Sequence, residues 1–421
     1  MTSERMNAIF PPLRVVLADK NDANAQYSLG LMYDTGQGAP QDYAEAMKWY
    51  RKAADQGLAS AQYNLARMHV LGNGIPSSDA EAAKWFRKAA EQGFVRAQYN
   101  LGRMYAHGQG VAQDFAEAAK WYREAANQGN TYAPNNLGVM YENGQGVERD
   151  LGEAVKYFRM AAEMGNAAGQ FNLGRMYDTG QGTPQDFAAA LKWYRSAADQ
   201  GIVRAQFNLG RLYGQGLGVP LDHAEAIKWF RMAADRDDAQ AQFSVALWYD
   251  SGLGVPPDAK AAMKWYRMAA DAGNDAAQNN LGRMYEDGRS VPQDLAEAAR
   301  WFRKAADQNN AAAQFNLGRM HENGRGVARD YAEATRWYRK AADQGDAAAQ
   351  FNLGNLCYTG RGETEDYVEA HKWFKLASSR FPAGEKEQRD RAVQNAGLVA
   401  SKMTAAQLAE AQKRARVWKP N

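Results

Sequence analysis

Residues 97–129 read AQYNLGRMYAHGQGVAQDFAEAAKWYREAANQG, and this pattern returns every 36 residues from about Asn24 to Phe381 without insertion or deletion. Every copy but the fourth opens on a glutamine and carries a tryptophan 23 residues later. The glutamines are Gln26, Gln62, Gln98, Gln170, Gln206, Gln242, Gln278, Gln314 and Gln350. The fourth copy keeps the phase, with Pro134 and Tyr157 in those places. A fixed period with helical patterning inside each copy predicts a solenoid, which grows by stacking.

Each copy is predicted to form two helices joined by a glycine loop. In the third copy the apolar residues of 97–105 share one helical face, and the Gly-Gln-Gly of 108–110 ends that helix. Asp114 and Glu117 then open a second helix as a predicted capping box, in which the aspartate accepts from free amides and the glutamate reaches back. Gly102 predicts close contact with the partner helix, because a mid-helix glycine costs about 1 kcal/mol relative to alanine.

The composition excludes several classes of protein. Among 421 residues, 51 Lys and Arg balance 48 Asp and Glu, so no net field favours nucleic acid or anionic lipid. The single cysteine, Cys357, rules out a disulfide framework and a four-thiolate metal site. No apolar run reaches the length of a membrane span, so membrane insertion is not expected.

Both ends are expected to be caps. We divide the chain into an N-terminal segment (1–23) with a degenerate capping helix, ten repeats (24–382), and C-terminal capping helices with a tail (383–421). The N-terminal helix is expected within 6–20. The C-terminal helices are expected at 385–402 and 404–417, the second opened by Thr404 with Gln407 three residues later.

The expected location is cytoplasmic. Ala23-Asn24-Ala25 has the small-x-small form of a signal cleavage site, but Pro11, Pro12 and Arg14 interrupt the segment before it. A periplasmic or secreted location is the alternative if Met1–Ala25 acts as an atypical signal.

The repeated string Ala-Gln-x-Asn-Leu-Gly-x-x-Tyr-x-x-Gly-x-Gly-Val-x-x-Asp-x-x-x-Ala-x-x-Trp-(Tyr/Phe)-x-x-Ala-Ala-x-x-Gly resembles the Sel1-like repeat, a relative of the tetratricopeptide repeat. The resemblance implies an all-α fold: a right-handed superhelical α/α solenoid of ten 36-residue repeats with helical caps at both ends. It also implies an adaptor that binds proteins or peptides, in bacteria among other settings. A secreted, cysteine-rich branch of the family has been linked to β-lactam binding, but this chain lacks the paired cysteines of that branch.

No catalytic, cofactor or metal site is expected from the residues. The Gly-x-Gly loops lack the strand that precedes a phosphate-binding loop, and their recurrence is explained by helix termination. His69, His321 and Cys357 occupy a position that is tyrosine in most copies, which indicates packed substitutes. No two histidines share a helix at metal-binding spacing, and no base is evident for the thiol.

Three positions on the first helix are the candidates for partner binding, because tetratricopeptide geometry would place them on the concave face. One is aromatic (Tyr63, Tyr99 and Phe207), the next is an amide (Asn64, Asn100 and Asn208), and the third is an arginine (Arg67, Arg103 and Arg211). Asn and Arg at i and i+3 share a face, where amides can hold a peptide backbone and guanidinium groups can bind carboxylates.

Structural interpretations of these positions stay open. The aromatics are more typical of packing, and the amides fit an inter-repeat ladder equally well. Arg175, Arg283 and Arg319 have an acid three residues later, so local pairing is expected for them. Arg67, Arg103 and Arg211 have Val70, Ala106 and Gly214 there instead.

The sequence therefore predicts a non-enzymatic adaptor or scaffold that binds a protein or peptide along its concave face, with acidic groups of the partner as candidate contacts for the arginines. No nucleic-acid partner is expected, and the chain is expected to be a monomer or a weak end-to-end dimer. The alternatives are a β-lactam- or peptidoglycan-related hydrolase, by family analogy alone, and an architectural spacer without a groove ligand.

Overall fold

The computed structural model describes residues 18–420, and within that range every regular element is a helix. The first helices of the ten copies are α3 (Ala23–Thr35), α5 (Ala59–Leu71), α7 (Val95–His107), α9 (Ala133–Asn143), α11 (Ala167–Thr179), α13 (Val203–Gln215), α15 (Ala239–Ser251), α17 (Asp275–Asp287), α19 (Ala311–Asn323) and α21 (Ala347–Thr359). The second helices are α4 (Tyr43–Asp55), α6 (Asp79–Glu91), α8 (Phe115–Asn127), α10 (Leu151–Glu163), α12 (Phe187–Asp199), α14 (His223–Ala234), α16 (Ala259–Asp271), α18 (Leu295–Asp307), α20 (Tyr331–Asp343) and α22 (Tyr367–Arg380).

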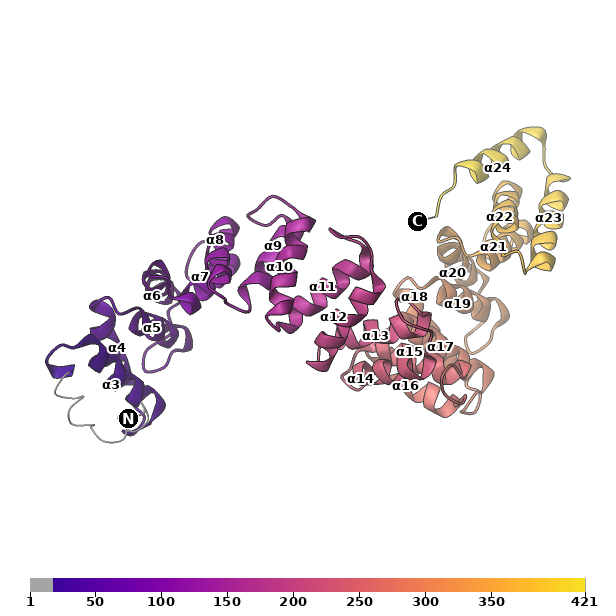
Figure 1. Cartoon of the computed structure of the whole chain (residues 1–421). Helices are drawn as coiled ribbons and strands as arrows, with labels where there is room; N and C mark the ends of the chain where they lie inside the picture. The colour runs from indigo at the N-terminus through magenta and orange to yellow at the C-terminus, as the bar shows by residue number, and fades with distance from the viewer. Residues whose placement is uncertain (1–17, 421) are drawn as a thin grey trace. The chain divides into compact units, whose positions relative to one another are not determined.

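The described chain forms two compact units. The first runs to Asn208 and includes Leu217–Pro220, and the second comprises Leu209–Gly216 and Leu221 onward. Within each unit, helical hairpins follow one another along the chain, each packed on the next (Figure 1). The predicted all-α solenoid of ten helix pairs is confirmed. None of the described helices is both long enough and apolar enough to cross a membrane.

Helix ends follow the predicted chemistry with one exception. Gly108 ends α7 at φ 66°, in the left-handed region. Asp114 Oδ1 accepts from the amides of Ala116 and Glu117, at 2.9 and 3.0 Å. The reciprocal half of the predicted capping box is wrong, because the Glu117 carboxylate instead accepts from Trp121 Nε1, at 3.1 Å. Trp121 is 8% exposed, so its indole N–H takes the glutamate to satisfy a buried donor.

Glycines allow two close approaches in most hairpins. A Cβ on Gly102 would lie 2.9 Å from the ring of Tyr122, so the predicted contact of the first helix with the second is confirmed. The second glycine of the loop has a different role. A Cβ on Gly110 would lie 2.1 Å from the backbone oxygen of Asp79, at the start of the preceding copy's second helix. This loop therefore touches the neighbouring copy through backbone atoms.

The recurring glutamine ties successive second helices together. Gln98 Nε2 donates to the carbonyl oxygen of Ala90 in α6, at 3.3 Å, while Gln98 Oε1 accepts from Gln128 Nε2 at the end of α8, at 3.0 Å. Gln98 is 3% exposed, so both bonds satisfy polar atoms that water does not reach. Gln26 makes the same bond to Ala18 O at 3.2 Å, which keeps the residues before α3 in repeat phase.

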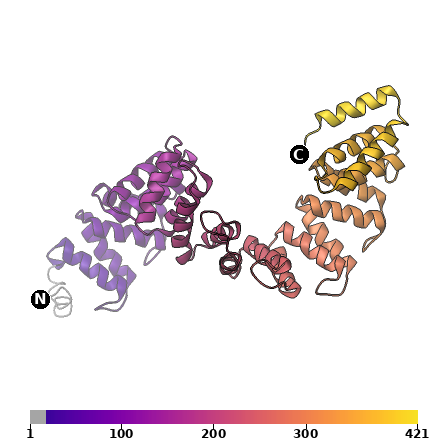
Figure 2. The ribbon, with the colours of Figure 1, turned by 45° about the vertical axis from the view of Figure 1, so that its right-hand side comes forward.

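The C-terminal cap is built as predicted, from α23 (Lys386–Ala400) and α24 (Ala405–Val417), which close the second unit (Figure 2). Thr404 and Gln407 form the predicted capping box. Both helices pack against α22. Most of the N-terminal capping helix expected at 6–20 lies outside the described residues.

Candidate functional site

Ion pairs link first helices of successive copies. Arg175 on α11 donates to Glu142 on α9 at 2.7 Å, and Arg319 on α19 donates to Glu286 on α17 at 2.6 Å. Glu286 is 5% exposed. Each arginine thus meets an acid 33 residues earlier, because a period of 36 residues less one helical turn brings those positions face to face.

The predicted local pairing of these arginines is therefore wrong. Asp178 and Glu322, the acids three residues after Arg175 and Arg319, accept from the phenol hydroxyls of Tyr194 and Tyr338, at 3.1 and 2.7 Å. Glu286 pairs with Arg319 and Arg325 rather than with Arg283. Burial and the neighbouring carboxylate raise the pKa of Tyr338. Sequence reasoning that considered only one helix could not distinguish these partners.

We call this series of ion pairs between successive first helices the ladder. Arg67 and Arg103 lie where the ladder is interrupted. The position 33 residues before Arg103 is Val70, so the acid of the ladder is replaced by valine at this arginine. For Arg67 that position is Asp34, which accepts from Tyr50 at 3.1 Å. Over residues 18–420 neither Arg67 nor Arg103 takes part in an ion pair, and both side chains are exposed. Arg211, the third predicted arginine, does have a partner in the described chain.

A hollow of about 290 Å³ forms at this gap, between α5, α6 and α7. It brings together four of the predicted residues, Tyr63, Arg67, Asn100 and Arg103. Its other lining residues are Val70, Leu71, Asp79, Phe86, Met104 and Gln109. Val70 and Leu71 are 43% and 59% exposed, so two adjacent aliphatic side chains face solvent at the hollow. We call these ten residues the α5–α7 hollow.

The asparagines divide into structural and available members. Asn172 donates to Asn135 at 2.9 Å and Asn316 to Asn279 at 3.0 Å, so these amides form rungs between copies. Asn64 is 7% exposed and lies 3.5 Å from the Tyr27 hydroxyl, which indicates the same structural role. Asn100 instead donates to Arg96 O of its own helix, at 2.9 Å, and stays at the wall of the hollow.

The predicted aromatics pack within the repeats. The Tyr63 ring lies 5.7 Å from that of Phe86 and 5.1 Å from that of Phe94. The ring centroids of Tyr99 and Tyr122 lie 5.8 Å apart. Phe207 likewise has a partner. Phe207, Asn208 and Arg211 all lie on α13 and do not line the α5–α7 hollow.

A second hollow of about 360 Å³ continues the gap on the other side of α7. Ala106 takes the acid's place there, and Val139 on α9 takes the arginine's. His107, Tyr122 and Asn136 supply polar groups. Sequence analysis missed the apolar members of both hollows. The signal that could have found them is the replacement of the acid by Val70 and Ala106. It becomes visible when each of these positions is compared with the position of the ladder's arginine, 33 residues later.

The nucleophile and metal candidates remain structural. Cys357 is 3% exposed, and burial raises the pKa of its thiol to about 12, so the thiolate is scarce at neutral pH. His69 and His321 are buried in the tyrosine position. Among residues 18–420 no group of three His, Cys, Asp or Glu side chains is arranged to hold a metal ion.

Comparison with known proteins agrees with the helical repeat architecture described above. The family model of the Sel1 repeat matches ten successive stretches: 23–58, 59–94, 95–130, 132–166, 167–202, 203–238, 239–274, 275–310, 311–346 and 347–380. The chain is similar to a protective antigen present in uropathogenic Escherichia coli strains that displays an SLR fold, at 40% identity over 95% of this chain and 85% of that one, with a TM-score of 0.87. It is also similar to a Sel1 repeat protein from Oxalobacter formigenes, at 37% identity over 78% of this chain and 93% of that one, with a TM-score of 0.60. Comparison with curated proteins found no match.

Proposed function

The chain belongs to the Sel1 repeat family, and from that premise we propose that it is a non-enzymatic adaptor whose α5–α7 hollow binds a partner segment. The segment carries acidic side chains beside an apolar one. The observation that supports this proposal is the pair Arg67 and Arg103, without ion pairs in the described chain, beside the exposed Val70 and Leu71.

The chemistry of the hollow favours an extended peptide over a folded surface. A guanidinium group binds a carboxylate through two parallel hydrogen bonds, and Arg67 and Arg103 lie on neighbouring first helices. Asn100 offers an amide for a peptide backbone, and Val70 with Leu71 offers apolar contact area. Asp79 lines the same hollow and repels an acidic group of the peptide at that point, so it helps to select the register in which the peptide binds.

The architectural spacer is the less favoured alternative. A spacer needs only internal contacts on this face, and the ladder supplies them at Arg175 and Arg319. At the α5–α7 hollow the acid of the ladder is instead replaced by valine, which leaves charge and apolar area exposed together. An inert surface gives no reason for that combination, because contiguous exposed apolar area typically marks an interaction site.

The test is selection of peptides from a displayed library by the intact protein, followed by affinity measurements with two variants. Arg67→Ala with Arg103→Ala should weaken the selected peptides about tenfold or more, and added salt should weaken wild-type binding. Arg283→Ala is the matched control, because Arg283 is an exposed arginine at the equivalent position of α17, outside the hollow. Equal affinities for wild type and the double variant, at unchanged melting temperature, would refute the proposal.

A further inference from the structure

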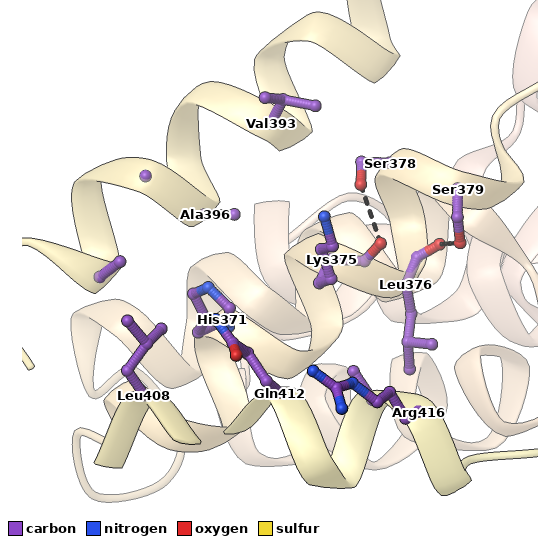
Figure 3. A pocket seen from close by; sticks show the side chains of 13 residues that line it. His371, Lys375, Leu376, Ser378, Ser379, Val393, Ala396, Leu408, Gln412 and Arg416 are labelled. Carbon is purple, nitrogen blue, oxygen red and sulfur yellow. Dashed lines mark hydrogen bonds between the residues drawn. The ribbon is translucent and has the colours of Figure 1, made fainter. Parts of the chain in front are cut away.

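The last three helices enclose a second kind of cavity, distinct from the α5–α7 hollow. It has a volume of about 640 Å³ and lies between α22, α23 and α24. His371, Lys375 and Leu376 line it from α22, Val393 and Ala396 from α23, and Leu408, Gln412 and Arg416 from α24 (Figure 3). Its volume falls within the range of small-molecule sites, about 300–1,000 Å³.

The cavity stands where a contact between copies is missing. In five other copies an arginine of the second helix hydrogen-bonds an aromatic side chain 18 residues later, on the next first helix. The pairs are Arg87 with Tyr105, Arg123 with Tyr141, Arg159 with Tyr177, Arg267 with Tyr285, and Arg303 with His321. In the last copy Lys375 takes the arginine's place, and α23, which no longer follows the repeat phase, presents Val393 to the cavity, 57% exposed. Among the described residues Lys375 therefore has no aromatic acceptor and borders an open space.

A buried polar side chain lines this space. His371 is 6% exposed, and its Nδ1 has no hydrogen-bond partner among residues 18–420. Burial, and then the charge of Lys375, lower the pKa of His371, so the imidazole is neutral at neutral pH and keeps one N–H donor. The equivalent position elsewhere is apolar or threonine. The residues there are Met47, Ala83, Ala119, Val155, Leu191, Ile227, Met263, Ala299 and Thr335.

The charges that line the cavity have one sign. Lys375 and Arg416 take part in no ion pair within residues 18–420, and no carboxylate is among the lining residues. Arg414, two residues before Arg416, shows the contrast, because it donates to Glu369 at 3.0 Å. Leu376, Ala396 and Leu408 provide apolar lining in the same cavity.

The walls are held in place by contacts outside the cavity. The Arg414–Glu369 pair fixes α24 on α22. Trp418 packs edge-on against Trp373 with ring centroids 6.3 Å apart, and Arg380 lies 4.2 Å from the centre of the Trp418 ring. A ligand therefore meets a formed site, which lowers the entropy cost of binding.

We propose that this cavity binds a small organic acid with an apolar ring or chain. The carboxylate accepts hydrogen bonds from Lys375 and Arg416, the apolar body fills the space beside Val393 and packs on Leu376 and Leu408, and His371 contributes a polar contact at the base. Such a ligand supplies an oxygen acceptor for Lys375, as tyrosine does for the arginine in four of the other copies, and an apolar group that fills the open space.

The test uses the intact protein and isothermal titration with three probes. 4-Phenylbutyrate has both a carboxylate and an apolar phenylalkyl group. 4-Phenylbutan-1-ol has the apolar group without the carboxylate, and acetate has the carboxylate without the apolar group. We expect 4-phenylbutyrate to bind at least tenfold more tightly than either. Equal affinity of the acid and the alcohol, or no binding by 4-phenylbutyrate, would overturn the proposal. So would binding of a short peptide ending in phenylalanine with a free carboxylate when 4-phenylbutyrate does not bind, because that result assigns the cavity to a peptide terminus.

Two variants locate the site. Lys375→Gln with Arg416→Gln should weaken 4-phenylbutyrate at least tenfold, whereas Lys413→Gln, an exposed charge of α24 outside the cavity, should leave it unchanged. Val393→Tyr should place a phenol ring in the cavity, fill the space and abolish binding, with an unchanged melting temperature. Undiminished binding by Val393→Tyr would place the ligand elsewhere and overturn the proposal.

Discussion

At the scale of single residues, one position of the first helix decides whether the arginine of the next copy has a carboxylate partner. Where it is Glu142 or Glu286, it pairs with the arginine of the next copy. Where it is Asp34 or Glu322, it accepts from a buried tyrosine of its own hairpin. Where it is Val70, the facing Arg103 keeps its charge exposed. One substitution thus separates a structural arginine from a candidate binding arginine.

Arg319→Met should lower the free energy of unfolding by about 1–3 kcal/mol, because it removes a partner of the buried Glu286 carboxylate. Arg325 still contacts Glu286, at 3.3 Å, and limits the loss. Arg103→Met should change stability by less than about 0.5 kcal/mol, as expected for an exposed side chain without a carboxylate partner. Denaturant unfolding of the two variants measures the difference, and equal losses would contradict the distinction.

Gly110→Ala should destabilise the protein more than Gly129→Ala. Both residues have positive φ, 66° and 84°, so both variants carry the cost of a left-handed alanine, about 1 kcal/mol. A Cβ on Gly129 meets nothing within 4 Å, whereas one on Gly110 overlaps the backbone of Asp79. Overpacking of this kind adds about 1–3 kcal/mol. Matching melting temperatures for the two variants would show that the loop can retreat from its neighbour.

At the scale of helices, the buried glutamine is the joint between a first helix and two second helices. The joint is complete where a glutamine stands 30 residues later, as for Gln98 with Gln128. Where that position is Arg236, Ala272 or Arg380, the oxygens of Gln206, Gln242 and Gln350 are buried without a partner. The copies therefore differ in how firmly their helices are joined, although the glutamine itself recurs.

Gln98→Met should lower the free energy of unfolding by about 1 kcal/mol more than Gln206→Met. The first variant loses two hydrogen bonds, whereas the second loses only the bond to Ala198 O, at 3.3 Å. Methionine keeps the volume of the side chain, so a cavity does not contribute. Urea midpoints of both variants against wild type provide the measurement. A larger loss from Gln206→Met would mean that the glutamine oxygen carries no stabilisation.

The helices themselves were largely predictable, because a glycine ends the first helix in every copy and an aspartate caps the second helix in all but the second copy, where Ser78 does so. The sequence also placed α23 and α24 and the capping box at Thr404. It predicted Tyr63, Arg67, Asn100 and Arg103 as candidates, and the structure brings them together. What it lacked was contact across copies: the 33-residue ion pairs and the 18-residue arginine–tyrosine pairs join helices whose facing is set by stacking. The cavity beside His371 was missed because the repeat phase is lost after Phe381.

At the scale of the whole molecule, stability is distributed along the chain. Within each unit, hairpins contact their neighbours along the chain, so interactions between distant copies cannot hold the unit in a single cooperative state. Copies with complete glutamine joints and ion pairs should open less readily than those without. Unfolding is therefore expected to proceed in stages rather than as one transition.

Cys357 provides a probe for this behaviour, because it is the single cysteine and lies buried in α21. A thiol reagent should label it slowly in the native protein, since burial raises the pKa of the thiol to about 12. With increasing urea, labelling should accelerate before circular dichroism reports loss of half the helix, because opening of the last copies suffices to expose the thiol. Coincident midpoints by both probes would instead establish a single cooperative transition.

The backbone contacts at the loop glycines also bear on how such a chain changes over evolutionary time. Gly110 meets main-chain atoms of the preceding copy, and Gln98 bonds a main-chain carbonyl there, so neither contact depends on which side chains the neighbour carries. Unequal recombination that inserts or deletes a unit in phase therefore creates a junction with the same fit as the old one. Copy number can drift under such exchange without a new interface having to be selected, while the binding residues travel with the copies that hold them.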